Sequence, residues 1–478
     1  MLERHKQVDF EMSGEKSAQA MADITDGSGL VENAAPIAGH AGINTNTPNV
    51  KKKGLTIFTA AVFIVGEMAG GGILSLPDSL VSAGWGGVAL LVFCAVMSAY
   101  TGIILGRCWQ ILKERFATYR ENHVRYPYPA IGCEAMGKIG RYAVTVCVNF
   151  TLFSVTTVFL LVASKLIHEL LCLANVHLPF CVWIPIIAAV LCPFTWLGTP
   201  KDFWPIAAGA AFSTGIACIL IFIQEMLDSA SAPARNHPPP SFQGFFTAFG
   251  AILFAFGGHA IFPSVQHDMK DTRKFNYTVY VAYIVVVAYY LPVSVGGYAV
   301  YGDTLKANIL DTLGHSTITT VVKVMISLHL LMGAIIVINP FCQELEEMLH
   351  APLKFSWQRV VIRSFVMAAV LFVAETIPEF SVILNIVGGT TVTLLTFVFP
   401  SLFYILLRRK EPPADVTQSN DLRIIHGLEY VLHGFIILVG VVGGVASTYS
   451  EVYDIATSSS ATFSAPCYVS QHNGTICG

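Results

Sequence analysis

Long apolar runs alternate with short polar segments along most of this chain. Each run is about 18 to 25 residues long, which is the length that an α-helix needs to cross the hydrocarbon core of a bilayer. The pattern predicts an all-α membrane protein with about eleven transmembrane helices, of which the fourth and ninth are the shortest. The expected spans cover residues 55–80, 85–112, 142–172, 181–198, 203–226, 243–264, 277–301, 318–348, 358–376, 381–407 and 425–447.

Composition supports a membrane protein and argues against several other classes. Hydrophobic residues fill 54% of the 478 positions and charged residues only 12%, a balance far more apolar than that of a soluble domain. The formal net charge of -3, without a basic patch interleaved with aromatic residues, argues against a nucleic-acid partner. The sequence has no nucleophile–base pair, metal-ligand spacing or phosphate-binding loop, so we expect neither an enzyme nor a bound metal or organic cofactor.

The distribution of lysine and arginine predicts how the spans are oriented. Most of these residues outside the spans lie in alternate loops, and the opposite loops hold Arg235 and Lys306. Because cytoplasmic loops carry the excess of positive charge, we expect a disordered cytoplasmic tail over residues 1–50 and a transmembrane domain over 51–447. A C-terminal tail over 448–478 then lies on the extracellular or lumenal side, and either the plasma membrane or an endolysosomal or vesicle membrane fits this orientation.

The C-terminal tail carries two further signals of the same orientation. Asn473 begins an Asn-Gly-Thr glycosylation acceptor, which is useful only on the non-cytoplasmic side. Cys467 and Cys477 lie in the same tail, and Cys172 and Cys181 bracket the loop after the third span. We expect each of these two pairs either to form a disulfide in an oxidising compartment or to remain as free thiols.

Two spans are interrupted by glycine pairs that are followed by proline. The first span reads GEMAGGGILSLP over residues 66–77, and the sixth reads FAFGGHAIFP over residues 254–263. Unpaired backbone groups are costly in lipid, so an ordinary spanning helix avoids such a sequence. If ten spans form two halves of five, these spans occupy corresponding positions, as in inverted-repeat transporters with discontinuous helices at the substrate site. Close helix packing at the glycines and simple kinks at the prolines are the alternative.

These motifs resemble those of the amino acid/auxin permease family, the family of the amino acid transporter transmembrane domain. GGGILSLP over residues 70–77 is similar to the first-helix signature, and FAFGGH over residues 254–259 is similar to the sixth-helix signature. Further matches are AGW over 83–85, GYAVYGD over 297–303, NIL over 308–310, Pro340 with Glu344 and Glu347, and residues 400–407. The resemblance covers residues 52–447 and implies a LeuT-like five-plus-five inverted repeat with one extra helix and an amino acid substrate.

The resemblance also implies where the substrate binds and which ion drives transport. We expect main-chain groups at the two breaks, together with a threonine of the third span, to surround a zwitterionic amino acid. The candidate substrate-binding residues are Gly66, Ala69, Gly70, Gly71, Gly72, Thr151, Phe256, Gly257 and Gly258. Sodium-coupled relatives have asparagine where Gly66 stands, so the resemblance favours a proton over sodium as the coupling ion.

Ionisable residues inside the spans are the candidates for proton coupling. Glu67 lies within the first span, where burial favours its neutral form and makes it the candidate proton carrier. A structural carboxyl between helices, either permanently protonated or paired with His259 or His329, is the alternative. We expect the His259 imidazole to face the cavity, where it would contact the substrate, exchange protons or latch the unwound segment. His329 and Ser327 lie on the eighth span, which flanks the cation site in the implied fold, and helix–helix hydrogen bonds are the competing interpretation.

Other charged residues lie near the ends of spans. Lys165, Lys323 and Arg363 are expected to extend their side chains to the membrane interface. The segment from Arg115 to Arg125 predicts either a cytoplasmic interfacial segment that gates the inner vestibule or a solvated loop.

These expectations describe a monomeric secondary transporter of small neutral amino acids that works by proton symport and alternating access. Its expected partners are the amino acid substrate and the lipid bilayer. A sodium-coupled amino acid symporter and an amino-acid-sensing receptor with little net flux are the alternatives.

Overall fold

The described part of the chain is α-helical. The computed structural model describes residues 54–121, 124–196, 204–230, 235–352, 355–410, 420–457 and 466–469. One isolated bridge joins Leu55 to Met269 within these ranges, and no longer β-pairing accompanies it there. The tail expected over residues 1–50, together with Asn473 and Cys477, lies outside the described residues.

The first five expected spans all coincide with helices, and the first of them is broken. Two short helices, α5 (Ala117–Glu121) and α6 (Pro127–Met136), lie between the second and third spans. The spans are α2 (Ile57–Met68) with the 3₁₀ turn η1 (Gly71–Ser75) and α3 (Leu76–Ala83), then α4 (Gly86–Arg115), α7 (Lys138–Leu173), α8 (Phe180–Trp196) and α9 (Trp204–Ser229).

The second five spans repeat this order, again with a break in the first, and one more helix follows them. They are α10 (Phe242–Ala255) with η2 (Gly258–Ala260) and α11 (Phe262–Asp268), then α12 (Phe275–Tyr301), α13 (Thr317–Met348), α14 (Trp357–Thr376) and α15 (Phe380–Val387) continued by α16 (Phe399–Arg409). Two π-helical segments, η6 (Gly388–Val392) and η7 (Leu394–Val398), separate α15 from α16. The last helix, α17 (Asn420–Thr457), continues past residue 447, where the sequence pattern placed its end.

Length and apolarity support crossing for most of these helices. Eight of the described helices are long and apolar enough to span a bilayer, and a ninth span results if α2 and the segment Gly71–Ala83 count as one, bent by 48° at its break. The helix α8 is shorter, and α8 and α14 stand at the fourth and ninth positions. These are the two positions where the sequence pattern predicted the shortest spans.

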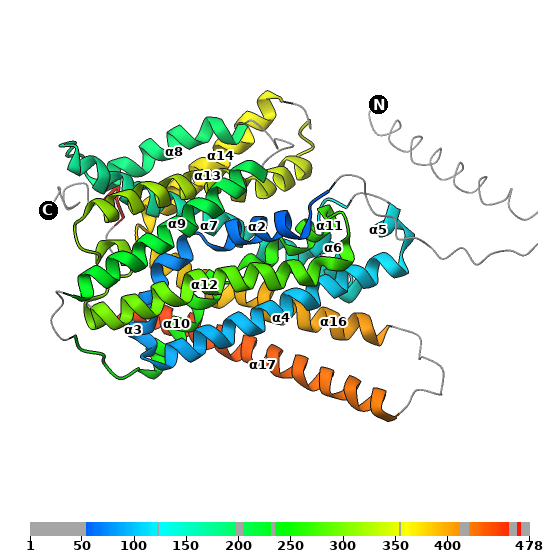
Figure 1. Cartoon of the computed structure of the whole chain (residues 1–478). Helices are drawn as coiled ribbons and strands as arrows, with labels where there is room; N and C mark the ends of the chain where they lie inside the picture. Colours follow the sequence, from blue (N-terminus) through cyan, green and yellow to red (C-terminus); the bar gives the residue numbers. More distant parts are fainter. Residues whose placement is uncertain are drawn as a thin grey trace, which may run out of the picture. The chain divides into compact units, whose positions relative to one another are not determined.

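Packing gathers the helices around the broken pair. The helix α13 packs against α7 and α9, while α14 packs against α8 (Figure 1). The helix α2 contacts both α9 and α12, and α10 contacts α3. The extra helix α17 lies along α10 and α16. Both broken spans are therefore enclosed by unbroken helices that fix their position.

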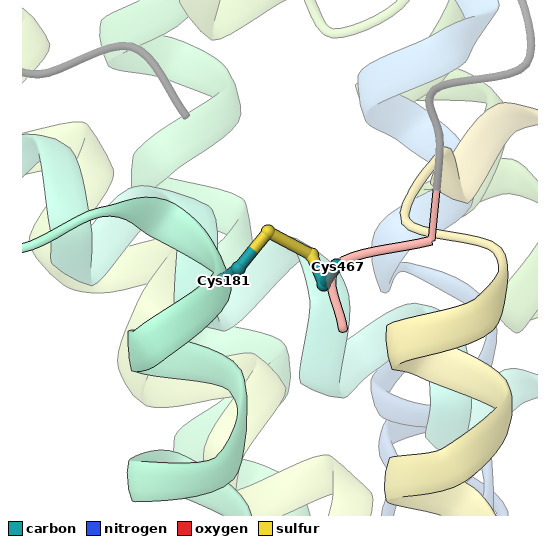
Figure 2. Close-up of a disulfide and its surroundings, with 2 residues drawn as sticks. All are labelled: Cys181 and Cys467. Atoms are coloured by element: carbon teal, nitrogen blue, oxygen red, sulfur yellow. A yellow bond between two sulfur atoms is a disulfide. The ribbon is translucent and has the colours of Figure 1, made fainter. Parts of the chain in front are cut away.

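A disulfide joins the C-terminal tail to the start of α8. Cys181 is bonded to Cys467, with the two Cα atoms 5.4 Å apart (Figure 2). The backbone N–H of Cys467 donates to the Glu375 carbonyl at 2.8 Å, and the Tyr468 ring stacks on Phe372, so the tail lies against α14. The pairings expected from the sequence, within one loop and within one tail, are wrong because folding brings the tail back to α8. Cys172 is also disulfide-bonded.

The disulfide also constrains how many times the chain crosses the membrane. Cys181 lies at the start of α8 and Cys467 follows α17, and bonded cysteines must lie on the same side of the bilayer. The number of crossings between them is therefore even, so α8 and α14 either both cross or both do not. We refer below to this face of the membrane as the disulfide side.

Candidate functional site

The two broken spans meet at their breaks. Gly72 lies so close to Ala255 that a Cβ atom at Gly72 would stand 2.7 Å from the Ala255 Cα atom. Tyr290 of α12 ties the same two segments together: its hydroxyl oxygen lies 2.6 Å from the Met68 carbonyl and 2.9 Å from the Ala255 carbonyl. These carbonyls belong to the last residues of α2 and α10, where a helix leaves carbonyl groups without an intrahelical partner. One buried hydroxyl therefore donates to whichever of the two freed carbonyls its proton faces.

A cavity lies between the breaks and α7. Its wall combines glycines and freed backbone from both breaks with apolar side chains, one hydroxyl and one carboxyl. The lining residues are Glu67, Met68, Gly70, Gly71, Gly72, Thr151, Leu152, Val155, Phe159, Phe254, Gly257, Gly258 and Ala260.

Six of the nine candidate substrate-binding residues line this cavity, and three do not. Gly70, Gly71, Gly72, Thr151, Gly257 and Gly258 are in its wall. Gly66 lines a second cavity, Ala69 is fully buried in packing, and Phe256 turns away to stack on Tyr283 and contact Tyr290. Helix rotation explains the difference, since residues one or two positions from a cavity-facing residue point to another side of the helix.

Glu67 stands between two cavities. The second cavity lies between α2, α7, α9 and α13, and its lining includes Gly66, Glu67, Phe159 and Gly333. Glu67 and Phe159 are common to both cavities and separate them. The predicted alternative, a Glu67 carboxyl paired with a histidine, does not occur among the described residues.

His259 does not line the cavity, contrary to the expectation from its position after the glycine pair. Its ring is fully buried and stacks on Phe262 at 4.7 Å between centroids. Its Nε2 atom lies 3.2 Å from the Thr101 hydroxyl of α4. The imidazole thus ties the unwound segment after α10 to α4, because the 3₁₀ turn at Gly258–Ala260 directs the side chain away from the substrate side.

The eighth-span candidates make contacts between or within helices. The Nδ1 atom of His329 lies 3.0 Å from the Thr214 hydroxyl and 3.1 Å from the Ala210 carbonyl, both on α9. The Ser327 hydroxyl donates to the Lys323 carbonyl within α13 at 2.7 Å. Neither residue lines the two cavities.

A π-helical segment supports the cavity from the tenth span. Thr151 of α7 shares a hydrogen bond of 2.7 Å with Thr391 in η6. Gly257 packs against Val392 of the same segment, which lies 3.0 Å from where a Cβ atom of Gly257 would be. Single π-helical turns inside α-helices are rare and occur often at functional sites. The tenth span therefore contacts both Thr151 and the break after α10.

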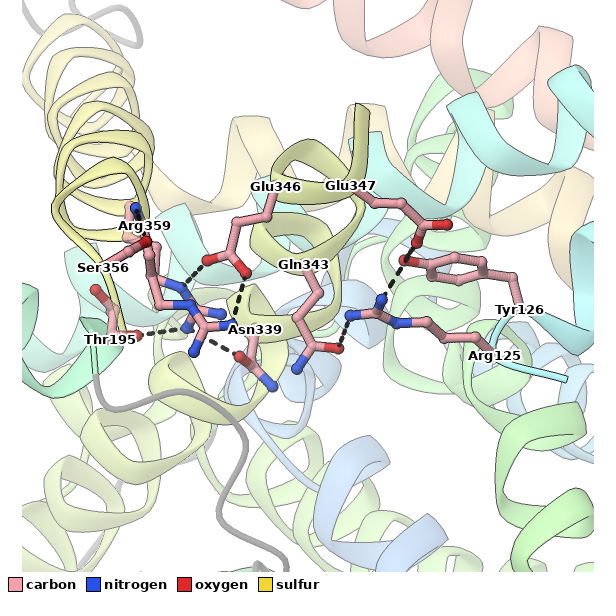
Figure 3. Close-up of polar contacts among 10 residues, drawn as sticks. Arg125, Tyr126, Thr195, Asn339, Gln343, Glu346, Glu347, Ser356 and Arg359 are labelled. Atoms are coloured by element: carbon pink, nitrogen blue, oxygen red, sulfur yellow. Dashed lines mark hydrogen bonds and ion pairs between the residues drawn. The ribbon is translucent and has the colours of Figure 1, made fainter. Parts of the chain in front are cut away.

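Three glutamates near the end of α13 connect it to three different elements. Glu346 is buried between Arg359 and Arg363 of α14, at 3.1 Å and 2.5 Å, and Arg363 also donates to Asn339 and to the Thr195 carbonyl of α8 (Figure 3). Arg363 is 1% exposed, so the expectation that it reaches the membrane interface is wrong. Lys165 and Lys323 are likewise paired, with Asp311 and Glu169 respectively.

The other two glutamates contact the third span and the segment before it. Glu344 accepts from Asn149 of α7 at 3.0 Å. Glu347 accepts from Arg125 at 3.2 Å and from the Tyr126 hydroxyl at 3.0 Å (Figure 3). Arg125 and Tyr126 thus contact α13 through Glu347, a contact that leaves both the gating interpretation and the solvated loop as predictions.

Sequence reasoning missed two residues that shape the site. Tyr290 joins the breaks and Phe159 separates the cavities, but each is one aromatic residue within an apolar run. Only the glycines that Phe159 contacts give an indirect signal: a Cβ atom at Gly70 or Gly333 would stand 2.7 Å or 2.8 Å from its ring.

Comparisons with known proteins agree with this architecture. A family model described as transmembrane amino acid transporter protein matches residues 53–449. The chain is 23% identical over 419 residues to Amino acid transporter AVT1J of Arabidopsis thaliana, covering 84% of this chain and 92% of that protein. It is 24% identical over 414 residues to Lysine histidine transporter-like 4 of the same plant, covering 81% and 88%.

Two solved structures of similar fold are of a nucleobase-cation-symport-1 family transporter. Mhp1, a nucleobase-cation-symport-1 family transporter in a closed conformation with bromovinylhydantoin bound, matches with a TM-score of 0.52 and 15% identity, covering 86% of this chain and 95% of that one. Its inward-facing conformation gives a TM-score of 0.53 and 13% identity, covering 89% and 96%. At these identities the likeness shows the fold, which is the LeuT-like fold that the family resemblance implied.

Proposed function

This chain belongs to the transmembrane amino acid transporter family, and we propose that it carries small neutral amino acids together with protons by alternating access. The substrate would bind in the cavity between the two breaks. The observation that carries the proposal is that one ionisable residue, Glu67, stands in the wall of this cavity and also in the wall of the next one.

The backbone at the breaks suits a zwitterion. The turn η1 begins at Gly71 in the cavity wall, and the first N–H groups of a helical segment have no partner within it. Such N–H groups favour a carboxylate, while the freed carbonyls at the end of a helix favour an ammonium group. The glycines leave this backbone uncovered, so the substrate main chain can approach it closely.

The remaining wall favours a small, uncharged side chain. Met68, Val155, Phe159 and Phe254 supply apolar surface around the breaks, and Thr151 adds one hydroxyl. A substrate ammonium group could pair with an ionised Glu67, whereas a protonated Glu67 leaves the wall without charge. One relative is named for lysine and histidine, so cationic amino acids belong in the test.

Packing around Gly66 supports a proton, rather than sodium, as the coupling ion. A Cβ atom at Gly66 would stand 2.8 Å from the Ala207 carbonyl oxygen of α9. The asparagine that sodium-coupled relatives carry at this position would therefore displace α9 from α2. With a glycine, this position supplies no side-chain oxygen for sodium, which prefers oxygen ligands.

Glu67 is placed to pass a proton from one cavity to the other. A carboxyl group that faces a closed apolar cavity favours its neutral form, and access to water on the other side favours release. Proton and substrate would both bind in the first cavity, and the proton would leave through the second. Their joint binding can shift the conformational equilibrium only through a higher affinity for the conformation that closes.

Uptake into proteoliposomes tests the proposal. Radiolabelled alanine, glycine, proline, lysine and histidine are supplied at about pH 5.5 and about pH 7.5, with and without sodium. The parent protein is compared with Glu67→Gln and with Glu451→Gln, which removes a buried carboxyl on α17 that contacts Asn385 rather than the cavity.

We expect uptake of the small neutral amino acids to rise at acid pH without sodium, and this pH dependence to disappear in Glu67→Gln alone. Uptake that depends on sodium and is unchanged by Glu67→Gln would refute the proposal that a proton is the coupling ion. Saturable binding without flux of any of the five amino acids would favour a receptor instead.

A further inference from the structure

A second carboxyl group, outside the cavities, is buried without any partner. Glu225 lies near the end of α9 and is 0% exposed, and neither of its carboxyl oxygens has a hydrogen-bond partner. Among the described residues it is the one buried carboxyl group for which both oxygens are left unpaired. The proposed proton path through Glu67 does not use it.

Close backbone approach holds Glu225 against α12. A Cβ atom at Gly296 would stand 2.3 Å from Oε2 of Glu225, and a Cβ atom at Gly297 would stand 3.2 Å from Oε1. The same position at Gly297 is 3.0 Å from Pro77 of α3 and 3.3 Å from Ile309 in the loop before α13. The carboxyl group therefore sits where α9, α12, the second half of the broken first span and this loop meet.

This junction lies on the disulfide side of the membrane. The helix α7 ends at Leu173, shortly before Cys181, and Lys165 near this end pairs with Asp311 in the loop that contains Ile309. Pro77 follows η1, whose glycines line the cavity. The packing of α3 and α12 against Glu225 thus blocks the path from the cavity to the disulfide side of the membrane.

The ionisable neighbours of Glu225 cannot neutralise an ionised carboxylate. They are Asp228 and Cys218 on α9 and Tyr301 on α12. Asp228 already accepts from the Tyr301 hydroxyl at 2.5 Å, from Gln224 at 2.6 Å and from the Gly314 N–H at 2.9 Å, and none of these groups brings a positive charge to Glu225.

Two lysines of the adjoining helices are paired with other carboxylates, Lys306 of the loop is exposed, and Arg235 lies beside Gly302, with no ion pair between either of the last two and Glu225 among the described residues. Lys323 of α13 binds Glu169 at 2.7 Å, and Lys165 of α7 binds Asp311 of the loop that contains Ile309. No ion pair joins either lysine to Glu225. Burying an isolated carboxylate in such a site costs much free energy. Burying the neutral acid costs less, because the neutral group is hydrated more weakly.

From this geometry we propose that Glu225 is a proton-binding switch for the closure on the disulfide side. With a proton bound, the neutral carboxyl group fits against Gly296 and Gly297, and α3 and α12 close over the cavity. When the proton leaves, the carboxylate needs water, so α9 must separate from α12 and α3. The inference rests on the proposed alternating-access cycle, to which it adds a second protonated group besides Glu67.

Cysteine accessibility tests this switch without requiring transport. Ile309 is fully buried at the junction, so Ile309→Cys reports on its opening. The full-length protein in lipid nanodiscs is treated with a membrane-impermeant maleimide at about pH 5.5 and about pH 8. Labelling is corrected for the native cysteines and divided by that of His315→Cys, an exposed position in the same loop, which removes the pH dependence of the reagent.

In the parent background we expect normalised labelling of Ile309→Cys to rise several-fold at the higher pH. Glu225→Gln, which mimics the neutral acid, should keep labelling low at both values, while Glu451→Gln should keep the rise. A rise that persists in Glu225→Gln, or no rise in the parent, overturns the proposal.

A second variant opens the junction by another route. Gly296→Ala places a methyl group against Oε2 of Glu225, so it should increase labelling at both pH values. Low, unchanged labelling in Gly296→Ala would contradict the close approach on which the switch depends. In both variants, unaltered labelling of His315→Cys shows that the loop keeps its structure.

Transport measurements separate this inference from the proposed function. If the labelling switch depends on Glu225 but no amino acid is carried, the proposed function fails and the switch stands. If acid-driven amino acid uptake depends on Glu67 while labelling ignores pH, the transport proposal stands and the switch is refuted.

Discussion

Replacing Tyr290 by phenylalanine tests whether one hydroxyl group holds the two breaks together. Tyr290 is fully buried, and its hydroxyl is the described donor that lies within reach of both the Met68 and Ala255 carbonyls. Phenylalanine keeps the ring that packs on Phe256 and removes the donor alone. The change therefore keeps the shape of the side chain and removes the one hydroxyl that, among the described side chains, contacts both broken spans.

The expected loss is that of one hydrogen bond. A hydroxyl has a single proton, so it donates fully to one carbonyl at a time, although two acceptors lie near it. A buried acceptor left without a partner costs about 1–3 kcal/mol. If all of this energy aligns the breaks for binding, substrate affinity falls by a factor of about 5 to 150.

Tyr298 provides a matched control on the same helix. It is fully buried as well, but its hydroxyl has no hydrogen-bond partner, so Tyr298→Phe removes an unsatisfied group. We expect Tyr290→Phe to lower the thermal unfolding temperature in detergent and to raise the KM for uptake, whereas Tyr298→Phe leaves both unchanged or raises the unfolding temperature. Equal behaviour of the two variants would show that the Tyr290 hydroxyl does not hold the breaks.

Two further predictions concern packing and buried charge. Gly72→Ala should impair folding or uptake by about 1–3 kcal/mol, because its methyl group meets the Ala255 backbone at 2.7 Å, while Gly209→Ala, with open space around it, should be neutral in the same unfolding and uptake assays. Glu346→Gln should lower stability by about 3–5 kcal/mol because it leaves the Arg359 and Arg363 charges unbalanced in the interior; an unchanged unfolding temperature would refute this reading of the cluster.

Spans and breaks could be predicted because their signals are local. Hydrophobicity along about 20 residues reflects the bilayer thickness directly, so each apolar run became a helix. The Gly70–Gly72 and Gly257–Gly258 clusters likewise showed where each helix would end, and both lie in the cavity wall. Even the carboxyl at Glu67 stood out, since few charged residues occur inside spans.

Other features depend on contacts between distant segments and left no local signal. Cys181 meets Cys467 across 286 residues, so cysteines close in sequence gave wrong pairs. The direction of the His259 side chain depends on the turn geometry at the break and on Thr101 of α4. Glu225 gave no signal in the sequence, because its burial depends on the glycine pair of α12.

The bond between Cys181 and Cys467 makes a covalent ring that contains every span from α8 to α17. A protease that cuts the chain once between α13 and α14 would therefore leave two fragments that separate only after reduction. The ring also records biosynthesis, because Cys467 reaches Cys181 only after α17 has been made and inserted. The oxidised form is thus a chemical marker of chains whose later spans are all in the membrane.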